Sequence, residues 1–152
     1  MPDALVFRPM TGVDLTAVLA IEQRSFPTPW SRASFEKELG TTWARLTVAE
    51  ERHVAGTRLV GYTCTWRVVD DVQLLNAAVH PACRGRGLGR ALVRRVLDEA
   101  ATERARTVLL EVRAGNQTAR RLYAALGFQG VRVRRGYYGP GQDAIVMERR
   151  LR

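Results

Sequence analysis

The chain has 152 residues, of which 46% are hydrophobic and 26% are charged. This length and composition fit a single globular domain over residues 1–152 and exclude a disordered protein. No apolar run reaches the length of a membrane span, and the N-terminus lacks the basic and apolar regions of a signal peptide, so we expect a cytoplasmic protein.

The formal net charge is +9, and all but one of the 24 basic residues are arginine. Such a charge favours anionic partners, for example the phosphates of CoA, an acidic peptide or RNA. Genome composition explains a uniform arginine bias equally well, so charge alone does not indicate nucleic-acid binding. The two cysteines, Cys64 and Cys83, and the two histidines, His53 and His80, have no metal-ligand spacing, and we expect no metal.

The first half of the chain predicts a strand near residues 5–10 and then two helices. Thr11 can cap the first helix, whose apolar residues recur at spacings of three and four, and Ser31 can cap the second. The run Phe26-Pro27-Thr28-Pro29-Trp30 separates the two helices. Three strands are expected to follow, over residues 43–49, 59–69 and 72–79, with a turn around 53–57.

The second half predicts a helix over residues 88–101 with an apolar stripe at i, i+4, and then a strand over 107–112 that is buried on both faces. Asn116 caps a further helix that Gly127 ends. Strands over 128–133 and 144–147 close the chain. The order β-α-α-β-β-β-α-β-α-β-β predicts an α/β fold with a mixed central sheet of about seven strands and four helices.

The loop before the third helix is rich in glycine and arginine. Glycines let the backbone approach a ligand closely, and a helix N-terminus adds partial positive charge, so the loop favours an anion such as a pyrophosphate. The chain has no Walker A run, which would end in Gly-Lys-Ser/Thr. The pattern G-x-G-x-x-G fails as well, because Arg90 stands three residues after Gly87 where the last glycine would be. The spacing fits Arg-x-x-Gly-x-Gly, formed by Arg84, Gly87 and Gly89. A glycine turn with solvated arginines is the structural alternative.

Glu111 is a carboxylate in an otherwise apolar strand. An ionised carboxylate is costly there unless it faces a cleft or a partner, so Glu111 is a candidate general base. The alternative is a structural ion pair with one of the many arginines, and Arg113 is too close along the strand to be the favoured partner. The residues favour the catalytic interpretation.

Three tyrosines are further candidates. Tyr123 lies one turn before its helix ends, where a tyrosine is usually part of the core, although a neutral phenol would also be a suitable proton donor to a departing thiolate. Tyr137 and Tyr138 lie in a glycine-rich segment, residues 134–144, between two strands. Exposed aromatic side chains there favour a peptide-binding surface, and a hairpin turn whose tyrosines pack on their own strands is an equal alternative.

Together these segments resemble the GNAT acetyltransferase superfamily over nearly the whole chain. Within it, the chain is similar to the RimI-type bacterial ribosomal-protein-alanine N-terminal acetyltransferases. The glycine-arginine loop matches the acetyl-CoA motif of the superfamily. The likeness to the subfamily rests on Leu110-Glu111-Val112-Arg113-Ala114 with Asn116, on Leu122-Tyr123 with Leu126-Gly127-Phe128, and on Tyr137-Tyr138 with Asp143-Ala144.

The resemblance implies that acetyl-CoA donates an acetyl group to the N-terminal alanine of a small-subunit ribosomal protein, by direct attack in a ternary complex. It implies Glu111 as the general base and Tyr123 as the general acid. The residues implied to bind acetyl-CoA are Ala77, Ala78, Val79, Arg84, Gly85, Arg86, Gly87, Leu88, Gly89, Arg90 and Asn116. Those implied to bind the peptide are Phe26, Pro27, Trp30, Tyr137 and Tyr138.

Two other functions stay open. One is a GNAT enzyme that acts on a lysine side chain or a small amine. The paired tyrosines and the Glu111 segment argue against this function, because they suit an extended peptide. The other is a non-catalytic acetyl-CoA-binding or RNA-associated module. The presence of both Glu111 and Tyr123 argues against this function, because an active enzyme would use both residues. The run from Phe26 to Ser31 is two residues longer than the Phe-Pro-Trp-Ser of some relatives, so the sequence does not define the peptide preference.

Overall fold

A computed structural model describes residues 4–152 of the chain. In chain order the elements are β1 (Ala4–Pro9), η1 (Gly12–Asp14), α1 (Leu15–Ser25), α2 (Arg32–Leu39), β2 (Ala44–His53), β3 (Gly56–Val68), β4 (Asp71–Val79), η2 (Pro81–Cys83), α3 (Leu88–Thr102), β5 (Thr107–Arg113), α4 (Gln117–Ala125), β6 (Gln129–Arg134) and β7 (Ala144–Arg150). The predicted order of strands and helices is confirmed, and the two 3-10 turns η1 and η2 are additional.

The boundaries differ from the predictions where backbone pairing extends an element. β2 and β3 pair up to His53 and Gly56, so the predicted turn is reduced to residues 54–55. β7 runs three residues beyond its predicted end because it pairs with β5 as far as Arg150. Thr11 caps the 3-10 turn η1, which precedes α1, and its N–H donates to the Asp14 carboxylate at 2.8 Å.

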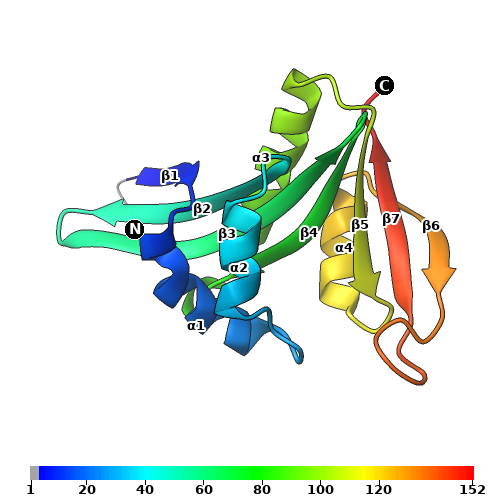
Figure 1. Cartoon of the computed structure of the whole chain (residues 1–152), viewed down its shortest axis with the longest axis horizontal. Coiled ribbons are helices and arrows are strands. Elements are labelled where there is room, and N and C mark those ends of the chain that lie inside the picture. Colours follow the sequence, from blue (N-terminus) through cyan, green and yellow to red (C-terminus); the bar gives the residue numbers. More distant parts are fainter. Residues whose placement is uncertain (1–3) are drawn as a thin grey trace. The chain divides into compact units, whose positions relative to one another are not determined.

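The strands form a mixed sheet of order β1-β2-β3-β4-β5-β7-β6, in which β4 and β5 are parallel (Figure 1). The chain divides into two compact units. Unit 1 extends to Trp66 and resumes over Asn76–Val93, and unit 2 comprises Arg67–Leu75 and Arg94–Arg152. That the whole chain forms one domain stays a prediction.

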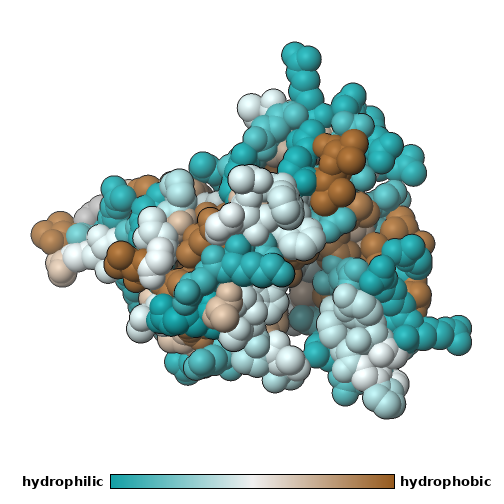
Figure 2. Space-filling view, in the orientation of Figure 1, coloured by the Kyte–Doolittle hydropathy of each residue, from teal (hydrophilic) through white to brown (hydrophobic). Residues whose placement is uncertain are grey.

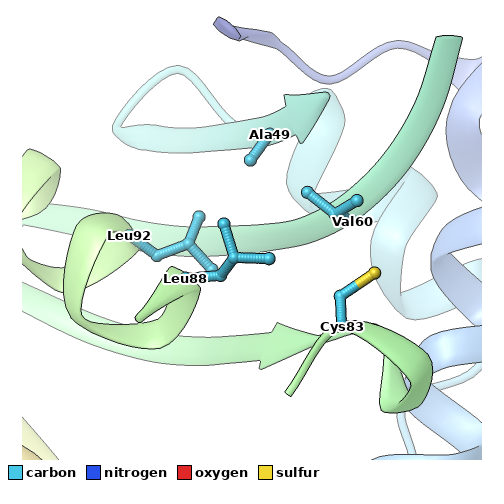
Figure 3. Close-up of a cluster of buried hydrophobic side chains, with 5 residues drawn as sticks. All are labelled: Ala49, Val60, Cys83, Leu88 and Leu92. Atoms are coloured by element: carbon cyan, nitrogen blue, oxygen red, sulfur yellow. The ribbon is translucent and has the colours of Figure 1, made fainter. Parts of the chain in front are cut away.

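The core of unit 1 fixes the beginning of α3. Leu88 and Leu92 of α3 point toward Val60 of β3, and Ala49 of β2 and Cys83 of η2 complete this buried cluster (Figure 3). On the remaining length of unit 1, α1 and α2 contact each other, and α2 packs on β2. The start of α3 is therefore held by side chains from three other elements of unit 1.

Gly61 of β3 allows α3 to approach the strand closely. A Cβ atom at this position would lie 2.8 Å from Leu92 Cδ1 and 2.9 Å from the carbonyl oxygen of Ala78. Both distances are well inside normal van der Waals separation, so a larger residue would push the helix or β4 away.

In unit 2, β5 is the central strand between β4 and β7. Val108, Leu110 and Val112 are buried, and this confirms the expected core strand over most of its length. The expectation of burial on both faces is wrong at Glu111, which is exposed. An ionised side chain at this position avoids the cost of desolvation.

The face shown in Figure 2 is dominated by hydrophilic residues with scattered hydrophobic side chains between them. None of the helices within residues 4–152 is long and apolar enough to cross a membrane.

Candidate active site

The loop from Arg84 to Gly87 joins η2 to α3 in unit 1, and the predicted binding residues Leu88, Gly89 and Arg90 form the first turn of α3. Gly85 and Gly87 have φ values of 79° and 81°, in the left-handed region that favours glycine. A Cβ at either position would meet nothing within 4 Å, so the backbone of the loop faces open space. With the first N–H groups of α3, the loop has the geometry of an anion-binding turn.

The arginine side chains of this loop bind other parts of unit 1. Arg84 donates from Nε to the carbonyl oxygen of Val79 at 3.2 Å and from Nη2 to Ser25 Oγ at 3.0 Å. Arg86 forms an ion pair with Glu51, which is 2% exposed. These contacts anchor the loop to β4, α1 and β2, so the backbone rather than the guanidinium groups is left to contact an anion.

The residues predicted to face the peptide in unit 1 lie between α1 and α2. Phe26 and Trp30 are half-buried and Pro27 is exposed. The Trp30 ring packs on Phe35, with ring centroids 5.2 Å apart. Ser31 then caps α2 by accepting from the Ser34 N–H at 3.1 Å, as its sequence position predicts.

Glu111, Arg113 and Arg134 lie on one face of the sheet in unit 2. Directly paired residues of antiparallel strands lie on the same face, and the register pairs Glu111 with Val146, and Arg113 and Arg134 with Ala144. Glu111 Oε1 lies 3.3 Å from Arg134 Nη1 across the intervening strand β7. Glu111 therefore does form a structural ion pair, which was the alternative to a catalytic role, and its partner Arg134 lies on β6. The carboxylate nevertheless remains accessible.

The tyrosine pair lies beside these charges. The rings of Tyr137 and Tyr138 meet edge to face with centroids 5.0 Å apart. The guanidinium carbon of Arg113 lies 4.0 Å from the centre of the Tyr138 ring, and that of Arg134 lies 5.1 Å from the Tyr137 ring. These cation–π contacts hold Tyr138 against β5, the strand that carries Glu111, and Tyr137 against β6.

The environment keeps two phenols of unit 2 protonated. Burial raises the pKa of Tyr123, and the charge of an ionised Tyr138 would raise it further. Burial also raises the pKa of Tyr138, and the next contribution is the negative charge of Glu111. Tyr123 packs edge to face on Phe128 at 5.7 Å, but it is half-buried rather than fully buried as a core residue would be. Both hydroxyl groups remain able to donate a proton.

The sequence and structure also match known proteins. A model of the acetyltransferase (GNAT) family matches residues 15–128, which is most of the chain. The chain belongs to the GNAT acetyltransferase family. As a GNAT member it is an N-acetyltransferase whose co-substrate is acetyl-CoA.

Full-length relatives narrow the comparison within the GNAT family. The chain is 38% identical over 141 residues to the ribosomal protein bS18-alanine N-acetyltransferase of Salmonella typhimurium, a match that covers 91% of this chain and 92% of that protein. It is 37% identical over 142 residues to a putative enzyme of the same name from Bacillus subtilis, with 92% and 91% covered. The crystal structure of the Escherichia coli ribosomal-protein-S18-alanine N-acetyltransferase has a TM-score of 0.86 and 32% identity, and covers 97% of this chain and 94% of that one.

The two units divide the predicted GNAT site residues between them. Unit 1 holds the glycine loop, the end of β4 and the run 26–30, and Arg84 links the first two through Val79. Unit 2 holds Glu111 and the three tyrosines. Asn116 caps α4 by accepting from the Ala119 N–H at 3.1 Å, which confirms its predicted capping role, and its contact with acetyl-CoA stays a prediction.

Sequence reasoning missed two residues. Arg134 was not assigned to Glu111, because the pairing depends on strand order. Glu22, 1% exposed, was not singled out as a buried carboxylate. A signal for Glu22 was present, because it continues the apolar spacing of Leu15 and Val18 at i, i+3, i+7.

Proposed function

We propose that this GNAT enzyme acetylates the α-amino group of a protein N-terminus, namely the N-terminal alanine of a small-subunit ribosomal protein. The proposal is supported by its 38% identity to the Salmonella enzyme over nearly the full length of both chains. The structural observation that carries it is the accessible carboxylate of Glu111 beside the paired tyrosines of unit 2. A ribosomal substrate would place the enzyme in the cytoplasm.

The glycine loop fits the pyrophosphate of acetyl-CoA. Its two glycines with positive φ face open space, and the N–H groups at the start of α3 lack helical acceptors. Bound there, acetyl-CoA supplies an acetyl group already activated as a thioester. The backbone N–H near Ala77 is proposed to donate to the thioester carbonyl and so stabilise the charge that develops on its oxygen.

Glu111 is proposed to remove a proton from the substrate α-ammonium, directly or through water. Its side chain is 31% exposed and therefore open to a substrate. Arg134 must release or share the carboxylate when the cationic N-terminus approaches. The paired tyrosines would hold the peptide backbone beside it, since their rings are fixed by Arg113 and Arg134.

Tyr123 is proposed to protonate the departing CoA thiolate. Its pKa is raised above the ordinary value of 10.0 by burial, so the phenol holds its proton at neutral pH. A group that is protonated before the reaction can serve as a general acid without a preceding proton uptake.

The acid–base chemistry favours an N-terminus over a lysine side chain. An α-amino group has a pKa of about 7.7–8.0 against about 10.4 for lysine, so its deprotonation near neutral pH costs roughly 3 kcal/mol less. A single accessible carboxylate is therefore better matched to an α-amino group.

The test compares wild type and Glu111→Gln on an alanine-initiated peptide with a free N-terminus, the same peptide with a blocked N-terminus, and a blocked peptide containing lysine. Turnover confined to the free N-terminus, and lost in Glu111→Gln, is the expected result. Equal turnover of the blocked lysine peptide would move the activity to side chains. Binding of acetyl-CoA without turnover of any peptide would contradict the proposed enzyme.

A further inference from the structure

Glu22 on α1 is a buried carboxylate outside the chemistry proposed above. Its side chain is 1% exposed. Oε1 accepts from the Tyr62 hydroxyl at 2.6 Å and from Asn76 Nδ2 at 2.7 Å, and Oε2 accepts from the backbone N–H of Trp30 at 3.0 Å. One side chain therefore joins α1, β3, β4 and the segment before α2, all within unit 1.

The three partners all donate hydrogen bonds, and the two oxygens of the Glu22 side chain accept all of them. An amide and a backbone N–H can only donate here, and the Tyr62 hydroxyl also donates, because burial and its bond to Glu22 raise its pKa. Glutamine has one acceptor oxygen, and its NH₂ group would face at least one of these donors. Glu22→Gln therefore leaves a donor without an acceptor while the volume of the side chain is unchanged.

The donors come from two segments with different predicted roles. Trp30 ends the run 26–30, which is predicted to face the peptide. Asn76 directly precedes Ala77, whose backbone is predicted to meet the thioester. The Trp30 ring also packs on Phe35, and Phe35 packs edge to face on Tyr62 at 6.0 Å. Glu22, Trp30, Phe35 and Tyr62 thus form a closed set of contacts.

We propose that Glu22 is a positioning residue, which fixes the peptide-facing run 26–30 relative to the end of β4 that receives the acetyl thioester. This inference rests on the proposed N-terminal acetyltransferase activity. The burial of a carboxylate among neutral donors is costly, and apolar packing between α1 and the sheet would avoid that cost. The carboxylate instead attaches the run 26–30 and β4 to one point through directional hydrogen bonds.

Glu38 provides a matched control in the same unit. It lies on α2, is 8% exposed, and accepts from Trp66 Nε1 at 2.7 Å. Glu38→Gln also converts a buried carboxylate to an amide, but the hydrogen bond that it alters goes to β3 rather than to the run 26–30 or β4. The two variants therefore separate the loss of a buried carboxylate from the loss of this particular attachment.

The experiment measures KM for an alanine-initiated peptide, kcat, acetyl-CoA affinity by calorimetry and thermal stability for wild type and both variants. We expect Glu22→Gln to raise the peptide KM on the order of tenfold, since a displaced substrate contact has effects of this size or larger. Acetyl-CoA affinity and kcat at saturating peptide should change less than about threefold. Glu38→Gln should lower stability and leave the peptide KM unchanged.

An unchanged peptide KM in folded Glu22→Gln overturns the proposal, and so does an equal rise in Glu38→Gln. If Glu22→Gln does not fold, hydrogen exchange at the Trp30 amide of the wild type provides the test. Protection of this amide that increases when acetyl-CoA binds supports the attachment to β4, and exchange that acetyl-CoA leaves unchanged overturns it. This measurement needs no turnover, so it separates the role of Glu22 from a failure of the proposed activity.

Discussion

Glu111 and Arg134 form an ion pair across an entire strand. Glu111 lies on β5 and Arg134 on β6, with β7 between them, and their charged atoms are 3.3 Å apart. The contact is possible because both residues pair with neighbouring positions of β7 on the same face, Val146 and Ala144. The proposed general base is thus accompanied by a cation within unit 2.

The coupling between these two residues is testable. Arg134→Met should lower kcat/KM about three- to fivefold, because an exposed pair of this kind contributes less than about 1 kcal/mol to the orientation of Glu111. In the Glu111→Gln background the same substitution should lower the residual kcat/KM less, because only its contact with Tyr137 is then lost, as measured by steady-state kinetics in a double-mutant cycle. Arg132→Met, on the same face of β6, is the control. Additive effects of Arg134→Met and Glu111→Gln would show that the pair plays no part in the reaction.

The tyrosines should separate into a proton donor and a peptide contact. Tyr123→Phe is expected to lower kcat by roughly 10²-fold or more with little change in the peptide KM. Tyr138→Phe retains the ring beside Arg113, and should mainly raise the peptide KM. Since the pKa of Tyr123 lies above 10.0, wild-type kcat should show no loss from this group up to about pH 9. A kcat defect in Tyr138→Phe alone would assign the proton donor to Tyr138.

A substitution in the glycine loop should weaken acetyl-CoA binding selectively. Gly87→Ala adds a methyl group to the open space that the loop faces and strains a residue with φ 81°, at a cost of about 1–2 kcal/mol. Its acetyl-CoA Kd should rise about tenfold or more by calorimetry. Gly56→Ala, at φ 146° in the first residue of β3, should lose stability but keep its affinity. Equal affinities in Gly87→Ala and wild type would remove the loop from the pyrophosphate site.

Acid stability should depend on Asp14. Arg8 donates to both of its carboxylate oxygens, at 2.7 and 2.8 Å, and this contact lowers the pKa of Asp14 below the ordinary value of 3.8. Its contribution to stability is complete above about pH 4 and is lost as the pH falls through the lowered pKa. Asp14→Asn should cost about 1–2 kcal/mol near neutral pH, since Arg8 is partly exposed.

Urea unfolding measured between about pH 2 and pH 7 checks this prediction. The difference between wild type and Asp14→Asn should narrow at the acidic end, where the wild-type carboxyl is protonated. Asp98→Asn, on the exposed side of α3, should track wild type throughout. A gap for Asp14→Asn that stays constant with pH would show that the pair does not set the acid stability.

Local signals in the sequence predicted most of the fold. Ser31 and Asn116 cap the helices that they were expected to cap, because a helix cap depends only on residues a few positions away. The partners of Glu111 and Glu22 depend on strand order and on which side chains meet across the sheet. Glu22 looks like an ordinary polar residue of a surface helix until Tyr62 and Asn76 are brought to it.

The exposed strand β6 gives the arginine content of the chain a physical consequence. β6 ends the strand order, and its Val131 and Val133 are 50% and 51% exposed. An open edge with valines is a template for self-association into extended sheets. Arg132 and Arg134 alternate with these valines, and the register shift between Gly130 and Arg132 interrupts the edge. Two copies meeting along β6 would bring like charges together, so the arginines protect this edge from aggregation.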